Sequence, residues 1–309
     1  MSQKEPINEP CGVLVIDKPN GMTSHDIVNK VRRLYGTRRV GHTGTLDPMA
    51  TGVLTVLIGR AAKAAEYLVS DRKTYLATLR LGLTTDTEDT TGEILTQSEQ
   101  IPDEEAVMEV LPRFRGEILQ VPPMYSALKV GGQKLYDMAR RGEVVERQAR
   151  PITIHRLEAE RLTETDYALR VTCAAGTYIR TLCADIGAAL GCGGAMASLR
   201  RTEAGGFTLA AHAHLLTELE QLEPAEREAL LLPVESLFAE LPAVRLSAFY
   251  ERLIRGGCAV DQRKLSQKLE SGQRVRLMNA AGEFFALGET VTDVESGALC
   301  VKAIKTFVL

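Results

Sequence analysis

The sequence lacks any apolar run long enough to cross a bilayer, which argues against a protein anchored by membrane-spanning helices. Residues 1–6 lack the apolar core of a secretory signal peptide. We therefore expect a cytoplasmic protein that makes no contact with membranes.

The sequence is also poor in the patterns that bind metals and cofactors. Its six cysteines are scattered and none forms a C-x-x-C pair, so neither a zinc site nor a disulfide framework is expected. The five histidines are dispersed, and the one close pair, His212 and His214, is interpreted as surface polarity. We find no phosphate-binding glycine loop, no dinucleotide fingerprint and no G-x-S-x-G element. We expect no metal and no cofactor, and a generic α/β hydrolase is disfavoured.

What is present fits a soluble globular chain. Its 309 residues suffice for one large domain and a small one, and 45% are hydrophobic and 25% charged. The net charge of −3 argues against nucleic-acid binding through bulk charge. Basic residues nevertheless outnumber acids between Lys18 and Asp47, whereas residues 81–112 contain acids and no Lys or Arg. Such separation allows one basic face toward phosphates, although a solvated helix face is the alternative.

Residues 38–54 form the most constrained stretch, with glycines, a proline, a histidine and the single carboxylate Asp47. Glycine permits backbone conformations closed to other residues, and Pro48 fixes the turn after Asp47. We predict a tight loop that holds Asp47 in a defined direction. A structural loop in which Asp47 caps the next turn is the alternative.

Four segments carry a family resemblance. Residues 41–48, continuing through residues 50–54, resemble the active-site signature of the TruB family of tRNA pseudouridine synthases. Residues 17–24, 73–75 and 176–182 resemble further family segments in the same order and spacing. Together the four segments span residues 17–182, which is more than half of the chain.

Local patterns predict an α+β fold. Thr23 and Asp26 resemble a capping box, and the helix that follows can end at Gly36. Residues 74–81 alternate as a half-buried strand. Residues 84–93 suggest a hairpin or rim loop, and residues 218–240 an acidic helical outer face. Further strands are expected at residues 11–16, 167–173, 275–277, 284–287 and 299–304, and a helix at residues 178–190.

The resemblance implies a central mixed sheet flanked by helices, followed by a small β-rich domain similar to a PUA domain. We place the catalytic domain at residues 1–241 and the PUA-like RNA-binding domain at residues 242–309, with a linker at residues 241–243. Glycines, basic residues and tyrosines interleave in residues 121–150, as suits a segment that clamps a nucleic-acid backbone. In the family this insertion grips RNA.

The resemblance also implies roles for individual residues. Asp47 is expected to be the nucleophile, and Arg180 to pair with its carboxylate and keep it ionised. Tyr75 and Tyr178 resemble the aromatic walls of a pocket for a flipped uracil, and the Tyr75 hydroxyl is a candidate proton carrier. His42 resembles the residue that fills the gap left by the flipped base. Leu199 resembles an apolar wall of the pocket, and Lys18 resembles a residue that supports the site.

The expected substrate is the uridine at position 55 in the T loop of tRNA, which base flipping and isomerisation convert to pseudouridine. Whether Asp47 attacks C1′ or C6, or promotes a glycal intermediate, is left open. Two alternatives remain: a tRNA-folding chaperone without essential catalysis, and a guide-RNA-dependent pseudouridylase. We expect a monomer with no obligatory protein partner. The candidate RNA-backbone contacts are Arg38, Arg39, Lys129, Arg140, Arg141 and Arg200.

Overall fold

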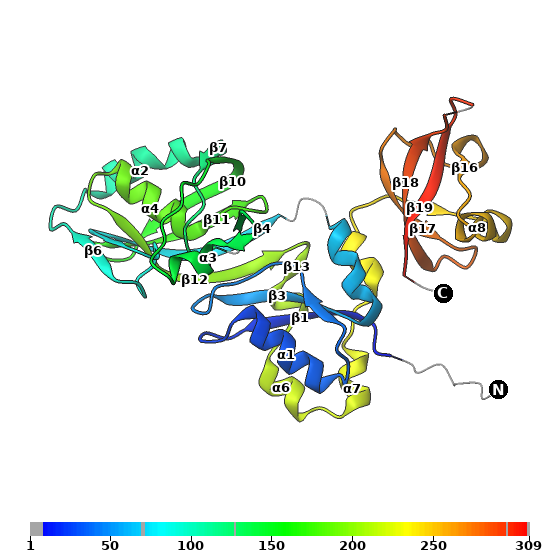
Figure 1. Cartoon of the computed structure of the whole chain (residues 1–309), viewed down its shortest axis with the longest axis horizontal. Coiled ribbons are helices and arrows are strands. Elements are labelled where there is room, and N and C mark those ends of the chain that lie inside the picture. The colour runs from blue at the N-terminus through cyan, green and yellow to red at the C-terminus, as the bar shows by residue number, and fades with distance from the viewer. Residues whose placement is uncertain (1–8, 69–71, 127, 295, 308–309) are drawn as a thin grey trace.

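The computed structural model describes residues 9–68, 72–126, 128–294 and 296–307, so residues 1–6, used above against a signal peptide, lie outside the described part. Two main sheets organise the chain, one of ten strands and one of five (Figure 1). No helix within these ranges is long and apolar enough to span a membrane. The mixed central sheet and the C-terminal β sheet confirm the predicted fold class.

The larger sheet is mixed. Its strands follow the order β14 (Ala213–His214), β1 (Gly12–Lys18), β3 (Thr51–Ile58), β12 (Gly194–Ala204), β4 (Lys73–Leu81), β11 (Asp166–Cys173), β10 (Arg150–Arg161) and β7 (Gly116–Gln120), with β2 (Val40–His42) on β3 and β13 (Phe207–Thr208) on β12. The pairs β1–β14 and β3–β12 are parallel, and the other pairs in this sheet are antiparallel.

Alternation along β1 and β3 gives each face of this half of the sheet its own core. Leu14 and Ile16 pack with helix α1 (Ser24–Leu34) and helix α6 (Leu216–Gln221). Val13 and Val15 face the other way, toward the 3₁₀ helix η1 (Gly59–Tyr67). The predicted capping box is confirmed, because Thr23 and Asp26 satisfy each other's backbone amides at the start of α1.

Helix α4 (Ile179–Ala189) lies against β12 and carries Arg180 into the interior. A Cβ atom on Gly187 would lie 2.1 Å from the backbone nitrogen of Gly194, so only glycine lets the helix approach this closely. Helix α2 (Glu104–Val110) and α4 cover the same apolar face of β4, β10 and β11. Alternation along β4 is as predicted, with Tyr75, Ala77, Leu79 and Leu81 buried.

The smaller sheet occupies the C-terminal part of the chain. Its strands follow the order β15 (Ala243–Arg245), β17 (Arg274–Met278), β18 (Phe284–Thr292), β19 (Leu299–Thr306) and β16 (Val260–Asp261). The predicted strands in this region are confirmed, and α8 (Ala248–Arg255) packs on the sheet (Figure 1).

Hydrogen bonds from Arg276 hold the predicted linker at residues 241–243 in place. The carbonyl of Leu241 accepts a bond from Arg276 Nε at 2.9 Å, and Arg276 Nη1 lies 2.6 Å from Glu235. The ring of Phe238, which precedes the linker, packs against the rings of Phe284 and Phe307, which follow it.

The prediction of a helical, solvated outer face over residues 218–240 is confirmed in part, because most of these residues are helical and only Leu219 and Phe238 among them are buried. The segment forms α6, α7 (Pro224–Ala229) and the 3₁₀ helix η3 (Val234–Phe238) as separate short elements. Pro224 and Pro233 interrupt a single helix because proline lacks an amide donor. Phe238 is buried because it contributes to the contact with the C-terminal sheet.

Between β4 and β10 the chain forms smaller elements. Residues 84–93 belong to a hairpin formed by β5 (Leu83–Thr85) and β6 (Ile94–Gln97), which was one of the two predicted alternatives. The insertion after β7 contains β8 (Lys129–Val130), β9 (Gln133–Lys134) and α3 (Leu135–Ala139). The 3₁₀ helix η2 (Leu111–Phe114) precedes β7.

Two further short elements lie elsewhere in the chain. They are α5 (Leu209–His212), after β13, and η4 (Gln262–Lys264), after β16.

Candidate active site

The loop that carries Asp47 is fixed by side chains from three other elements. The hydroxyl of Ser24 in α1 accepts from the Leu46 amide at 2.8 Å and donates to the Leu46 carbonyl at 3.1 Å. Arg201 in β12 donates to the Gly44 carbonyl at 3.1 Å. Lys18 in β1 donates to the Pro48 carbonyl at 3.2 Å. The loop therefore holds Asp47 in a defined direction, as its composition predicted.

Arg201 enters this network through an unusually close strand contact. It is the largest fully buried side chain, and its Nε donates to the Val53 carbonyl at 2.7 Å. Its backbone runs against Gly52, where φ is 102° and a Cβ atom would lie 2.1 Å from the Arg201 carbonyl oxygen. Only glycine combines this φ with such an approach, so Gly52 lets β12 bring Arg201 beneath the Asp47 loop.

Asp47 and Arg180 form an ion pair, as predicted. Arg180 Nε lies 2.9 Å from Asp47 Oδ2, and Nη2 lies 3.4 Å from Oδ1. The Arg180 side chain is 6% exposed, whereas that of Asp47 is 36% exposed. The guanidinium thus lies behind the carboxylate, and one side of the carboxylate remains open to a substrate.

Carbonyl groups from two loops seat the rest of the Arg180 guanidinium. Nη1 donates to the Thr87 carbonyl at 2.9 Å, and Nη2 donates to the Tyr125 carbonyl at 2.8 Å. Asp89 lies 3.9 Å from Nε, and its Oδ1 accepts from Thr91 and Thr87. Arg180 is therefore held from several directions, which fixes the orientation of its fork toward Asp47.

Glu88 lies beside this arginine in a strained backbone conformation. Its φ of 63° makes it the one non-glycine residue with positive φ in the described ranges. Its carboxylate accepts a short bond of 2.5 Å from the Thr181 hydroxyl in the first turn of α4. Burial raises the pKa of Glu88, while Thr181 and Arg180 oppose that shift. Sequence reasoning marked this segment as a rim loop but missed the roles of Glu88 and Asp89.

Tyr75 and Leu199 belong to one apolar cluster next to the Asp47 loop. Both side chains are buried, and the cluster includes Leu46, the residue before Asp47. Tyr75 and Arg201 are opposite each other in the β4–β12 pairing. Both side chains therefore belong to the core that borders the Asp47 loop, and their roles as walls of a base pocket stay a prediction.

Tyr178 precedes α4 as its N-cap residue, two positions before Arg180. The side chain is half-buried. Burial raises the pKa of the Tyr178 phenol. Its place at the helix start keeps it close to the Asp47–Arg180 pair.

The predicted supporting residue Lys18 is buried, and His42, the residue predicted to fill the gap left by the flipped base, is partly buried. Lys18 is fully buried and its Nζ also donates to the Pro19 carbonyl at 2.9 Å. Burial lowers the pKa of Lys18 to about 8, although the Asp47 carboxylate opposes the shift. Burial and the nearby Arg201 lower the pKa of His42, whose Nδ1 lacks a hydrogen-bond partner within the described ranges.

The predicted RNA-contact residues differ in what they bind within the chain. Arg38, Lys129 and Arg140 are exposed. Arg39 and Arg141 are also exposed, and they form surface ion pairs with Glu9 and Glu143. Arg200 is only partly exposed and forms a two-point ion pair with Asp17, at 2.7 and 3.1 Å.

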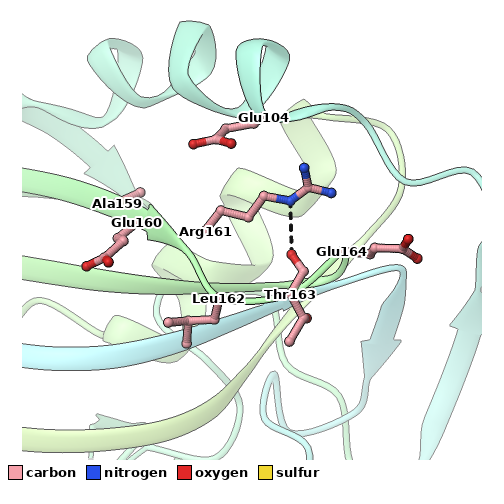
Figure 2. Close-up of a pocket in the computed structure, with 7 residues that line it drawn as sticks. All are labelled: Glu104, Ala159, Glu160, Arg161, Leu162, Thr163 and Glu164. Carbon is pink, nitrogen blue, oxygen red and sulfur yellow. Dashed lines mark hydrogen bonds between the residues drawn. The ribbon is translucent and has the colours of Figure 1, made fainter.

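A separate hollow lies at the turn between β10 and β11. Figure 2 shows Glu104, Glu160 and Glu164 around it, with Arg161 Nε donating to the Thr163 carbonyl at 3.0 Å. This turn is at the opposite end of β11 from Val171, the residue that pairs with Tyr75. The hollow is therefore distinct from the candidate active site.

Comparisons with known proteins agree with this geometry. The profile described as "TruB family pseudouridylate synthase (N terminal domain)" matches residues 32–179, and "tRNA pseudouridylate synthase B C-terminal domain" matches residues 180–239. A protein of Azoarcus sp. (strain BH72) named tRNA pseudouridine synthase B is 44% identical over 304 residues, covering 98% of each chain. The chain belongs to the TruB family.

Further relatives extend the match. The Burkholderia mallei (strain NCTC 10247) protein named tRNA pseudouridine synthase B is 45% identical over 271 residues, covering 87% of this chain and 89% of that one. A chain from the structure titled "Crystal Structure of a Cbf5-Nop10-Gar1 Complex" aligns with a TM-score of 0.74 at 27% identity, covering 99% of this chain and 88% of that chain. The TruB-family resemblance seen in the motifs is thus confirmed along the chain.

Proposed function

We propose that this TruB-family chain converts the uridine at position 55 in the T loop of tRNA to pseudouridine. The observation that carries the proposal is the Asp47–Arg180 pair, at 2.9 Å, beside the Tyr75–Leu199 cluster. Relatives at 44–45% identity bear the name tRNA pseudouridine synthase B, which supports the same activity and substrate class.

In the proposed reaction the uridine is extruded into the space between Asp47 and the aromatic side chains. Replacing lost base stacking with aromatic contacts is worth about 1–3 kcal/mol per base, so Tyr75 and Tyr178 offset part of the cost of flipping. His42 fills the gap that the base leaves, Leu199 bounds the pocket, and Lys18 supports the Asp47 loop.

The chemistry is an isomerisation in which one bond replaces another. The C1′–N1 bond breaks, the uracil rotates, a C1′–C5 bond forms, C5 loses its proton and N1 gains one. Asp47 supplies the carboxylate nucleophile, and the Arg180 guanidinium fixes its orientation through two hydrogen bonds. The Tyr75 hydroxyl is the proposed proton carrier at C5. The net reaction needs no oxidant and no phosphoryl donor, which agrees with an isomerase that uses no cofactor.

The RNA-binding surface is proposed to combine the insertion with the C-terminal sheet. We infer a catalytic domain at residues 1–241 and a PUA-like RNA-binding domain at residues 242–309. Exposed Arg38, Lys129 and Arg140 are free to approach stem phosphates, and Arg39, Arg141 and Arg200 join them by exchanging their ion pairs for phosphate.

We infer that the chain acts in the cytoplasm as a monomer without an obligatory protein partner. The neighbour at 27% identity was solved in a complex with Nop10 and Gar1, as its title states. The insertion after β7 resembles the RNA-gripping segment of stand-alone family members, which favours action without a guide RNA.

The proposal is tested with the purified chain alone and an unmodified tRNA transcript. Pseudouridine is mapped at single-nucleotide level after carbodiimide treatment, and a transcript with cytidine at position 55 is the control. We expect product at position 55 of the first transcript and none in the second. Product at other positions, or none without added proteins or guide RNA, contradicts the proposal.

A further inference from the structure

Gln120 is a buried amide at an otherwise exposed strand end. It is the last residue of β7 and is 2% exposed, while its neighbours Leu119 and Val121 are 70% and 43% exposed. Gln120 pairs with Arg150 of β10, so the two ends of the insertion meet at this point. A buried side-chain amide is stable only when its donor and acceptor find partners, so its contacts reveal what it holds.

Both partners of the Gln120 amide belong to a single residue. Its Nε2 donates to the Tyr178 carbonyl at 3.0 Å, and its Oε1 accepts from the Tyr178 amide at 2.9 Å. Tyr178 is the N-cap residue of α4 and provides no side-chain cap for the helix itself. Two bonds to one peptide backbone fix the position and the orientation of the turn that leads into Arg180.

The chain that follows Gln120 reaches the same arginine directly. The Tyr125 carbonyl accepts from Arg180 Nη2 at 2.8 Å, and Arg147 Nη1 donates to the Pro122 carbonyl at 3.0 Å. The first residues of the insertion are therefore bonded both to Arg180 and to the returning arm of the insertion. Gln120 lies where these connections start.

We propose that Gln120 is a positioning residue that couples the seating of the insertion to the Asp47–Arg180 pair. It contacts no reacting atom. It acts by holding the Tyr178 backbone, and through it Arg180, in register with the base of the insertion. When the insertion is seated on RNA, the Tyr125 carbonyl and the Tyr178 backbone together place the Arg180 fork against Asp47. The inference rests on the proposed function, because its readout is pseudouridine formation.

The test compares chemistry with binding and with folding. Single-turnover pseudouridine formation is measured with saturating enzyme for wild type, Gln120→Leu and Gln120→Glu, together with the Kd for tRNA and the unfolding temperature. Leu removes both bonds, while Glu keeps the acceptor and loses the donor. Because small misplacements of a catalytic group can cost about 10²-fold, we expect a loss of that order for Leu and a smaller one for Glu. The Kd is expected to stay close to that of wild type.

Asp166→Asn is the matched control for lost stability. It weakens the two-point pair with Arg80, at 2.7 and 2.8 Å, at the other end of β4 from Tyr75. We expect a lowered unfolding temperature and a wild-type single-turnover rate. Wild-type rates in Gln120→Glu, or an equal rate loss in Asp166→Asn, overturn the role of Gln120. An inactive wild-type protein instead contradicts the proposed function itself, so the two failures are distinguishable.

Discussion

Arg180 Nε lies 2.9 Å from Asp47 Oδ2, although 133 positions separate the two residues in the sequence. The arginine is buried and is also bonded to the carbonyls of Thr87 and Tyr125. A guanidinium fixed in this way presents its fork to the carboxylate without having to reorganise during the reaction. The partly exposed carboxylate of Asp47 therefore has a fixed orientation toward a substrate that approaches from its exposed side.

Arg180→Lys is predicted to lower the single-turnover rate by about 10²-fold or more, because an ammonium keeps the charge but loses the fork. The Thr87 and Tyr125 carbonyls also lose a donor, so a lower unfolding temperature is expected. Quench-flow measurement of product with saturating enzyme, after confirming the fold by circular dichroism, checks the prediction. A folded Arg180→Lys protein with the wild-type rate would show that the fork geometry is not needed.

Glu88→Gln is predicted to gain stability relative to wild type as the pH rises. Burial raises the pKa of Glu88 above its ordinary 4.5, so the folded protein binds more protons than the unfolded chain above that pH. Wild-type stability therefore falls as the pH rises from about 4.5 through the folded pKa, and the amide removes this loss. Urea unfolding of both proteins between pH 4 and pH 7 gives the difference. A difference that does not change with pH contradicts the buried-carboxylate interpretation.

Lys18 is predicted to titrate near pH 8 in the folded protein, because burial disfavours its charged form. The folded state then binds fewer protons than the unfolded state between about pH 8 and 10.5, so this group adds stability as the pH rises through that window. Loss of its charge removes a cation near Asp47, and the single-turnover rate should fall above pH 8. NMR of the lysine ε-carbons, assigned with Lys18→Met, measures the midpoint. A midpoint near the ordinary 10.5 would refute the prediction.

The double variant Arg140→Gln/Arg141→Gln is predicted to weaken tRNA binding and reduce its salt dependence. Each lost phosphate contact lowers the slope of log K against log salt by about 0.7–0.9, so two lower it by about 1.5. Arg156→Gln is the matched control, since Arg156 and Arg141 are both exposed and each pairs with a glutamate two positions away. Binding titrations across salt concentrations test this, and an unchanged slope in the double variant removes the insertion from the RNA contact.

Local signals in the sequence were sufficient for much of the fold. The Thr23–Asp26 capping box and the alternation along β4 involve neighbours in the chain, so their pattern is visible without the structure. The Asp47 loop could also be predicted, because its glycines and its proline all lie within residues 41–52. The helical character of residues 218–240 was also visible, but its division into short elements that begin near Pro224 and Pro233 was not foreseen.

The residues that support the site through hydrogen bonds to its backbone could not be predicted from the sequence. Ser24, Arg201 and Gln120 all bind backbone groups of segments distant in the chain. Any carbonyl or amide can serve as such a partner, so neither residue type nor spacing reveals the contact. The burial of Lys18 was hidden for the same reason, since it depends on the distant loop at Pro48. The pairing of Asp47 with Arg180 was foreseen only through the family resemblance.

The most direct test of the account compares wild type with Asp47→Asn on an unmodified tRNA transcript, measuring pseudouridine at position 55 and the tRNA Kd. Asn keeps the shape of the side chain and removes the nucleophilic carboxylate. We expect product at position 55 in the wild type, none in Asp47→Asn, and similar tRNA affinity for both proteins. Wild-type product formation by Asp47→Asn would contradict Asp47 as the nucleophile. Tight binding without product from either protein would contradict catalysis by the chain alone.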